Sequence, residues 1–270
     1  MLAVRTALGM ELLIICLSAL VGSGLTFFSG FGLGTILTPV FSLFFPVSAA
    51  IAMTAVVHLA NNLFKIGLVG RDAHWPTVLR FGLPAALAAI AGASLLSAVA
   101  VMAPWYGYEF LGRVHEITPV KASIGLVISA FALLELSPAF ARLAFPSKWL
   151  PVGGLLSGFF GGLCGNQGAL RSAFLIKTGL SKESYVGTGA TCAVLVDAVR
   201  IAVYGMAFQT TWGTAQSGQA GVPILAATVS AFLGAYFGKR LLKKMTLQVV
   251  ERGVAVMLIG IGMGLASGLL

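Results

Sequence analysis

The sequence predicts an all-α fold, a polytopic bundle of transmembrane helices. Hydrophobic residues make up 58% of the 270 residues, charged residues make up only 9%, and the mean hydropathy is +0.98. A soluble domain carries about 25% charged residues, so this chain has too few charges to cover a water-facing surface. Its apolar runs are about twenty residues long, the length of a membrane-spanning helix, whereas barrel strands would alternate over about ten residues.

Long apolar runs place the expected spans along the chain. We expect spans at 10–29, 48–69, 81–103, 119–141, 184–208, 220–238 and 248–269. Polar linkers separate them at 70–80, 104–118, 142–149, 209–219 and 239–247. Residues 1–25 resemble a signal peptide, but the apolar pattern continues into further spans, so we interpret this segment as a retained helix. Two Gly-rich stretches, 30–46 and 150–180, interrupt the pattern and indicate broken or re-entrant helices.

An internal repeat relates the two Gly-rich stretches. Ser23-Gly24 aligns with Ser157-Gly158, Thr38 with Ser172, Lys65 with Arg200, and Gly82 with Gly221. We therefore predict a first transmembrane repeat at 1–141, a linker at 142–149 and a second transmembrane repeat at 150–270. Paired halves are common in secondary transporters. One broken span in each half would give about eight crossings and parallel halves, whereas segments that fold back would allow inverted halves.

The distribution of basic residues slightly favours the inverted arrangement. Cytoplasmic loops of membrane proteins are enriched in Lys and Arg. This rule makes the 239–247 linker cytoplasmic, because it contains Lys239, Arg240, Lys243 and Lys244. Inverted halves would bring four further basic residues to the same side, namely Arg71, Arg80, Arg142 and Lys148. Membrane topology, and not nucleic-acid binding, therefore explains the formal net charge of +9.

The two Gly-rich breaks are candidate substrate sites. Glycine lets a helix unwind, and the N–H groups freed at the N-terminus of a half-helix favour an anion. Close helix packing through small residues is the alternative interpretation of these glycines. Asn166 and Gln167 favour a polar site, because amides at membrane depth need partners. We expect the hinge glycines to be Gly30, Gly32, Gly34, Gly161, Gly162, Gly165 and Gly168.

Charged and titratable side chains within the spans are the other candidates. Arg200 lies inside a span, where a charge faces a pathway or a partner, and Asp197 leaves open that the two simply pair at i, i+3. Lys65 occupies the matching place in the first repeat. His58, on nearly the same helix face, is a candidate for proton coupling or a buried, hydrogen-bonded histidine. We expect the substrate-binding residues to be Thr38, His58, Asn62, Lys65, Asn166, Gln167, Arg171, Ser172 and Arg200.

Other chemistries find little support in the sequence. Cys16, Cys164 and Cys192 lie in apolar segments without metal-ligand spacing, so we expect no metal site and no cofactor. The sequence contains no HExxH or GxSxG motif and no paired catalytic carboxylates, and its 8 acidic residues are too few for most acid–base schemes. We therefore predict a transporter and not an enzyme.

The run Gly-Phe-Gly-Leu-Gly-Thr-Ile-Leu-Thr-Pro at 30–39 resembles the G-x-G-G-G…P signature of the TauE/SafE family. So do its weaker copy at 161–172, the length of the chain and the two-fold hydropathy pattern. Leu33 departs from the signature at a central Gly, and Ala173 stands where the second copy would often have Pro. The resemblance implies a permease that exports sulfite, sulfonates such as sulfoacetate, or related organosulfur anions.

The residues and the resemblance together predict export of a small anion by alternating access between the two repeats. We expect a multi-pass protein of the inner (plasma) membrane. Its expected partners are a small anionic substrate and the lipid bilayer, without nucleic acid, and we allow for a homodimer. A passive anion channel and a transporter of another small organic anion are the alternatives.

Overall fold

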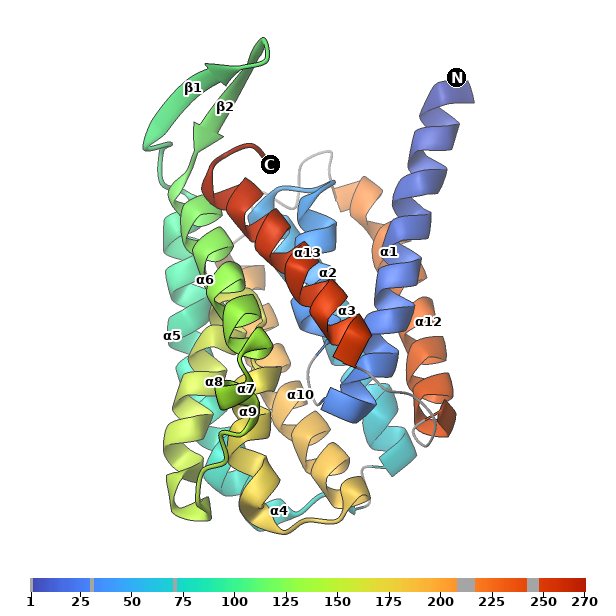
Figure 1. Ribbon diagram of the computed structural model, residues 1–270, viewed down its shortest axis with the longest axis vertical. Coiled ribbons are helices and arrows are strands. Elements are labelled where there is room, and N and C mark those ends of the chain that lie inside the picture. The colour runs from blue at the N-terminus through green and yellow to red at the C-terminus, as the bar shows by residue number, and fades with distance from the viewer. Residues whose placement is uncertain (1, 30–31, 70–71, 208–216, 242–247) are drawn as a thin grey trace.

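The computed structural model describes residues 2–29, 32–69, 72–207, 217–241 and 248–270 (Figure 1). The longer helices before residue 140 are α1 (Leu2–Ser29), α2 (Leu33–Ser42), α3 (Val47–Val69), α5 (Leu83–Ala100) and α6 (Pro119–Leu136). Those after it are α8 (Leu150–Cys164), α9 (Gly168–Leu175), α10 (Lys182–Ala207), α12 (Ser217–Leu241) and α13 (Gln248–Ala266). Short helical turns are α4 (Trp75–Thr77), a π-helical turn Val78–Gly82, α7 (Pro138–Ala141), and the 3₁₀ turns Ser147–Trp149 and Ile176–Thr178.

Helices long and apolar enough to cross a membrane dominate the described residues. There are 6 of them, at Gly9–Thr26, Val47–Leu68, Trp75–Ala100, Pro119–Leu136, Lys182–Ala207 and Ala220–Gly238. Two shorter apolar helices, Leu33–Ser42 and Arg252–Ala266, accompany them. Large side chains such as Leu87 and Leu225 are about two-thirds exposed, at 67% and 66%, as lipid-facing residues are. These helices confirm the prediction of a helical, multi-pass membrane protein.

The predicted linker 104–118 contains a β-hairpin, which departs from the all-α prediction. Strand β1 (Tyr106–Phe110) pairs antiparallel with β2 (Arg113–Ile117), so that Tyr108 lies opposite His115. Leu111 and Gly112 make the turn with positive φ angles of 53° and 71°, which the right-handed twist of a two-residue hairpin requires. The Tyr108 hydroxyl donates to the Ser267 carbonyl oxygen at 2.7 Å and ties the hairpin to the chain after α13.

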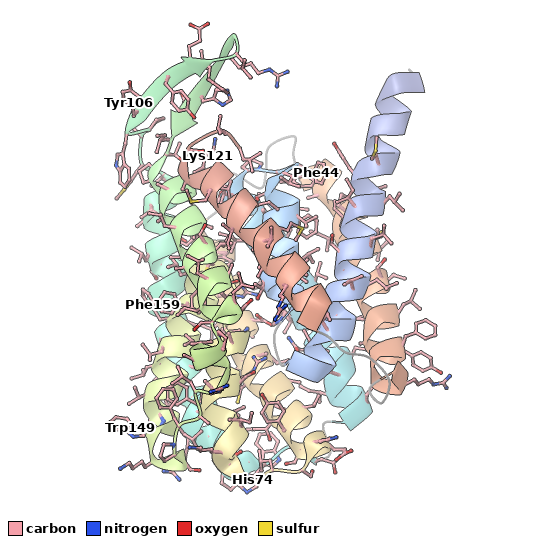
Figure 2. All side chains as sticks on the ribbon, viewed as in Figure 1. Phe44, His74, Tyr106, Lys121, Trp149 and Phe159 are labelled. Atoms are coloured by element: carbon pink, nitrogen blue, oxygen red, sulfur yellow. The ribbon has the colours of Figure 1, made fainter. Side chains whose placement is uncertain are left out.

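Four helix pairs make up most of the bundle, two of them parallel (α1 with α12, α5 with α8) and two antiparallel (α3 with α10, α6 with α13) (Figure 1). The hairpin projects from one end of the bundle, and α4 lies at the other (Figure 1). Figure 2 shows Tyr106 and Lys121 at the hairpin end and His74 and Trp149 at the α4 end.

Glycines bring the paired helices into backbone contact. A Cβ atom on Gly158 of α8 would lie 2.0 Å from the Ala85 carbonyl oxygen of α5, and one on Gly162 would lie 2.3 Å from that of Ala89. In the other outer pair, a Cβ on Gly234 of α12 would lie 2.2 Å from the Leu20 carbonyl oxygen of α1. Small residues drive such close association in membranes, where the apolar surfaces are already solvated by lipid. These glycines therefore serve packing.

The two breaks between helices include fewer of the expected hinge glycines than the sequence suggests. Gly161 and Gly162 were expected at the break but lie in the last helical turn of α8, because the turn continues to Cys164. Gly165 then adopts a positive φ of 85° and its N–H donates to the Gly161 carbonyl oxygen, and α9 begins at Gly168. In the earlier break, Gly32 has a φ of 143° and precedes α2, while Gly34 lies within that helix. Gly30 lies outside the described residues.

Candidate functional site

A buried ion cluster lies where α3 crosses α10. His58 Nδ1 is 2.6 Å from Asp197 Oδ2, and Arg200 Nε and Nη2 are 3.0 and 2.8 Å from Asp197 Oδ1. Asp197 and Arg200 are 0% exposed and His58 is 7% exposed. Charges removed from both water and lipid need partners, and here one carboxylate serves two basic side chains. Arg200 therefore pairs with Asp197 at i, i+3, and this pair is also part of a larger polar network.

Amide side chains complete the network around Asp197. Gln167 Nε2 donates to Asp197 Oδ1 at 3.3 Å, and Asn62 Nδ2 donates to Oδ2 at 3.5 Å. Arg200 Nη1 donates to the Gly161 carbonyl oxygen at 3.2 Å, in the last turn of α8. The cluster therefore joins α3, α10 and the break between α8 and α9, and it holds these three elements in one register.

Lys65 and Arg200 lie on opposite sides of the His58–Asp197 contact along the bundle. Helix α3 runs from the hairpin end toward the α4 end and α10 runs back (Figure 1). Lys65 follows His58 by seven residues, which is about 10 Å toward the α4 end, and Arg200 follows Asp197 by three residues, which is about 4.5 Å toward the hairpin end. We call these two regions the Lys65 side and the Arg200 side.

A cavity of about 30 Å³ lies on the Lys65 side. Its polar lining comes from Thr26 of α1, His58, Asn62 and Lys65 of α3, Arg171 of α9 and Tyr185 of α10. The ammonium of Lys65 donates to the Thr26 hydroxyl, and Arg171 Nη1 donates to Gln167 Oε1 at 3.5 Å. Lys65 and Arg171 are only 4% and 9% exposed, so the cavity places two cations deep inside the bundle.

Glycine makes room for one of these cations. A Cβ atom on Gly189 of α10 would lie 3.4 Å from Arg171 Nε, in van der Waals contact. Gly189 itself lines the cavity beside Ala190. The absence of a side chain on this face of α10 therefore lets the Arg171 side chain pack close to the helix beside the cavity.

The Arg200 side brings the two Gly-rich segments together. A Cβ atom on Gly34 of α2 would lie 3.1 Å from the Gly165 carbonyl oxygen, and one on Gly165 would lie 2.9 Å from Arg200 Nη1 and 3.7 Å from Thr38 Oγ1. Thr38 and Asn166 are 1% and 3% exposed. Within the described part of the chain, neither the Thr38 hydroxyl nor either polar atom of the Asn166 amide has a hydrogen-bond partner.

The structure therefore separates the nine expected substrate residues into groups. His58, Asn62, Lys65 and Arg171 line the cavity, and Gln167 joins them through Asp197 and Arg171. Thr38 and Arg200 both lie beside Gly165, the residue before Asn166, on the other side of the His58–Asp197 contact. Ser172 is a partly buried residue of α9 outside the cavity lining.

Three residues of the network were not among the expected substrate residues. Asp197 was weighed only as a partner of Arg200, although an acidic residue in the middle of a span is itself a signal. Thr26 and Tyr185 have no signal in the sequence, because a threonine and a tyrosine near the end of an apolar helix are ordinary. Among the described residues, no three His, Cys, Asp or Glu side chains gather closely enough to hold a metal ion.

A family model described as "Sulfite exporter TauE/SafE" matches residues 6–265, nearly the whole chain. No curated protein and no solved structure matches the chain.

Proposed function

The chain belongs to the Sulfite exporter TauE/SafE family, and from this premise we propose that it exports sulfite or a small organosulfonate by alternating access. The observation that carries the proposal is the buried cavity lined by Lys65 and Arg171. Burying two cations at membrane depth is expensive, so such residues mark substrate pathways. An anionic cargo offsets that expense whenever it is bound.

The lining of the cavity suits a sulfur oxyanion. Arg171 presents a planar fork that can donate two parallel N–H groups to two oxygens of a sulfite or sulfonate. Lys65 adds a compact charge, and Asn62 and Tyr185 offer neutral polar groups. The cavity of about 30 Å³ has room for about two or three waters, so it must widen when the anion enters.

The alternating-access part of the proposal includes two inverted repeats, which the pairing of helices supports. The described helix contacts are matched in pairs: α1 packs on α12 as α8 packs on α5, while α3 packs on α10 and α6 on α13. The alignment that pairs Lys65 with Arg200 also pairs Asn62 with Asp197, and these two side chains contact each other. Equivalent residues touch only on a two-fold axis, so an axis through the α3–α10 crossing would relate the halves. The division at 142–149 and the count of about eight crossings stay predictions.

Basic residues favour a cytoplasmic Lys65 side. The α4 end of the bundle carries Arg80 in the π-helical turn, Lys148 beside Trp149, Lys177 before α10 and Lys182 at its start. Loops rich in Lys and Arg stay in the cytoplasm. The cavity would then face the cytoplasm, where an exporter collects its cargo, and the hairpin would lie outside. Of the residues that led to this prediction from the sequence, Arg71, Lys243 and Lys244 lie outside the described residues.

The membrane potential supplies a driving force for this direction. In an inner membrane with 100 mV negative inside, each elementary negative charge that leaves gains about 2.3 kcal/mol. An anion could therefore be exported without a coupling ion. The contact between His58 and Asp197 is the place at which a coupled proton would reside if one is carried.

Efflux of labelled sulfite from proteoliposomes tests the proposal. The purified protein should release sulfite faster than protein-free liposomes do, and an outward-driving potential should increase the rate. Lys65→Met should reduce the rate at least tenfold, whereas the matched control Lys177→Met, at an exposed lysine, should leave it unchanged. Release no faster than from empty liposomes would contradict export of sulfite. A homodimer also stays a prediction, which native mass spectrometry in detergent can test.

A further inference from the structure

We propose that the Arg200 side holds a second anion half-site, closed in this structure, which receives the cargo when the protein opens toward the hairpin end. Thr38, Asn166 and Arg200 form it, and its ligand class is the same small oxyanion. The inference rests on the proposed function, because a closed half-site is useful only to a carrier that opens in turn on both sides.

Polar atoms without partners are the first observation. The Asn166 amide has an unpaired nitrogen and an unpaired oxygen, and the Thr38 hydroxyl is unpaired among the described residues. A buried polar group without a hydrogen bond destabilises the fold. Thr38 lies beside Gly165, the residue before Asn166. Two such residues at one backbone turn indicate a place where a polar ligand or water provides the missing bonds in another state.

The geometry around Gly165 is the second observation. A Cβ atom on Gly165 would lie 2.9 Å from Arg200 Nη1 and 3.7 Å from Thr38 Oγ1, so both groups lie beside this glycine. The next residue is Asn166, and α9 begins two residues later with its free N–H groups. A cation and a hydroxyl thus lie beside Gly165, with an amide residue and a helix N-terminus directly after it in the chain, and each of these groups binds oxyanions.

Close packing is the third observation, and it explains why this side is shut. Leu37 and Phe41 of α2 and Ile51 of α3 are all 0% exposed. The alignment of the halves pairs Leu37 with Arg171 and Phe41 with Leu175, and it pairs Ile51 with Val186. Arg171, Leu175 and Val186 line the cavity on the Lys65 side. Their counterparts therefore fill the space that would open if the two halves exchanged conformations.

Cysteine accessibility tests the second half-site directly. In a background with Cys16→Ser, Cys164→Ala and Cys192→Ala, we would introduce Thr38→Cys or, as a matched control, Val186→Cys. A membrane-impermeant thiol reagent is then applied from either side of the membrane, with and without sulfoacetate, a sulfonate that does not itself consume the reagent. We expect Thr38→Cys to react only from the hairpin side and at least threefold more slowly with saturating sulfoacetate, and Val186→Cys to react from the α4 side.

Failure of Thr38→Cys to react from the hairpin side in either condition would overturn the inference, as would reaction only from the α4 side. This result is separate from the sulfite efflux of the wild-type protein, whose absence would overturn the proposed cargo and leave the labelling pattern to decide the half-site.

A variant that keeps all native cysteines gives an independent readout. Asn166→Leu removes an unpaired amide and should fold with unchanged or raised thermal stability, yet lose at least tenfold in sulfite efflux. Ser129→Ala is the matched control and should leave efflux unchanged, because the buried Ser129 hydroxyl of α6 also has no partner in the part of the chain that the structure describes. Wild-type efflux by Asn166→Leu would remove Asn166 from the half-site and overturn the proposal.

Discussion

The Lys65 side and the Arg200 side of the bundle contain similar cationic and polar side chains but differ in whether those side chains have hydrogen-bond partners. On the Lys65 side, a cavity reaches two buried cations whose polar atoms are hydrogen-bonded to Thr26 and Gln167. On the Arg200 side, the cation is held by Asp197, and the hydroxyl and amide beside it have no partner among the described residues. The composition of a polar cluster therefore does not reveal whether it is accessible. On the Arg200 side, close packing by Leu37, Phe41 and Ile51 closes access to the cluster. On the Lys65 side, the cavity leaves the cluster accessible.

Asp197→Asn should have the largest effect on stability, because it removes the carboxylate that lies between the Lys65 side and the Arg200 side. It leaves Arg200 buried without its carboxylate, and breaking a buried ion pair in this way destabilises a protein by about 3–5 kcal/mol. The thermal unfolding midpoint of the detergent-solubilised protein should fall steeply. Asp72→Asn, at an exposed carboxylate, should leave the midpoint unchanged. Equal midpoints for the two variants would show that the ion cluster is not holding α3 and α10 together.

Gly165→Ala should disturb the Arg200 side alone. The positive φ of 85° strains any residue with a Cβ by about 1–2 kcal/mol, and the added atom would press on Arg200 Nη1. Gly179→Ala is the control, because Gly179 has a φ of 71° with no atom within 4 Å. We expect Gly165→Ala to lower the free energy of unfolding more than Gly179→Ala, and to slow sulfite efflux where Gly179→Ala does not.

Arg171→Lys should separate charge from geometry on the Lys65 side. The substitution keeps the positive charge but loses the fork that binds two oxygens, and a hydrogen bond to a charged group is worth about 1.5–3 kcal/mol. The sulfite concentration at half-maximal efflux should rise at least tenfold, while the maximal rate changes less. If Arg171→Lys binds sulfite as the wild type does, Arg171 acts only as a nearby charge.

Thr38→Val should have the smallest effect on the free energy of unfolding, and the effect should be opposite in sign to those of Asp197→Asn and Gly165→Ala. It removes an unpaired buried hydroxyl with little change of shape, so the free energy of unfolding should stay the same or rise by up to about 1 kcal/mol. Ser129→Ala should behave alike in the unfolding measurement. A clear loss of stability in Thr38→Val would mean that its hydroxyl is bonded, and the contrast between the two sides would weaken.

The sequence predicted most of the membrane-spanning fold and only part of the site. Apolar runs predicted helices close to α3, α10 and α13, because hydropathy acts over twenty residues and tolerates small errors at the ends. The hairpin at 106–117 was missed because its strands are five residues long and lie mostly exposed, which leaves little apolar alternation to detect.

The sequence could not predict which residues meet at the cavity, because they come from helices far apart along the chain. Lys65 and Arg171 are 106 positions apart in the printed sequence, and only the packing of α3 and of α9 against α10 brings them to one cavity. Likewise, glycines at a helix break and glycines at a helix interface look the same in a sequence. Gly162 turned out to pack against Ala89, whereas Gly165, three residues later, forms the break.

The glycine contact between α1 and α12 has a consequence for how the protein is made. Helix α1 leaves the ribosome early, and the partner that fits its Leu20 backbone, Gly234, is synthesised some two hundred residues later. During most of translation, α1 must therefore rest in the bilayer with this face against lipid or an insertion chaperone. The fold closes only when α12 arrives, so a ribosome that stalls before it would leave an open, degradation-prone intermediate in the membrane.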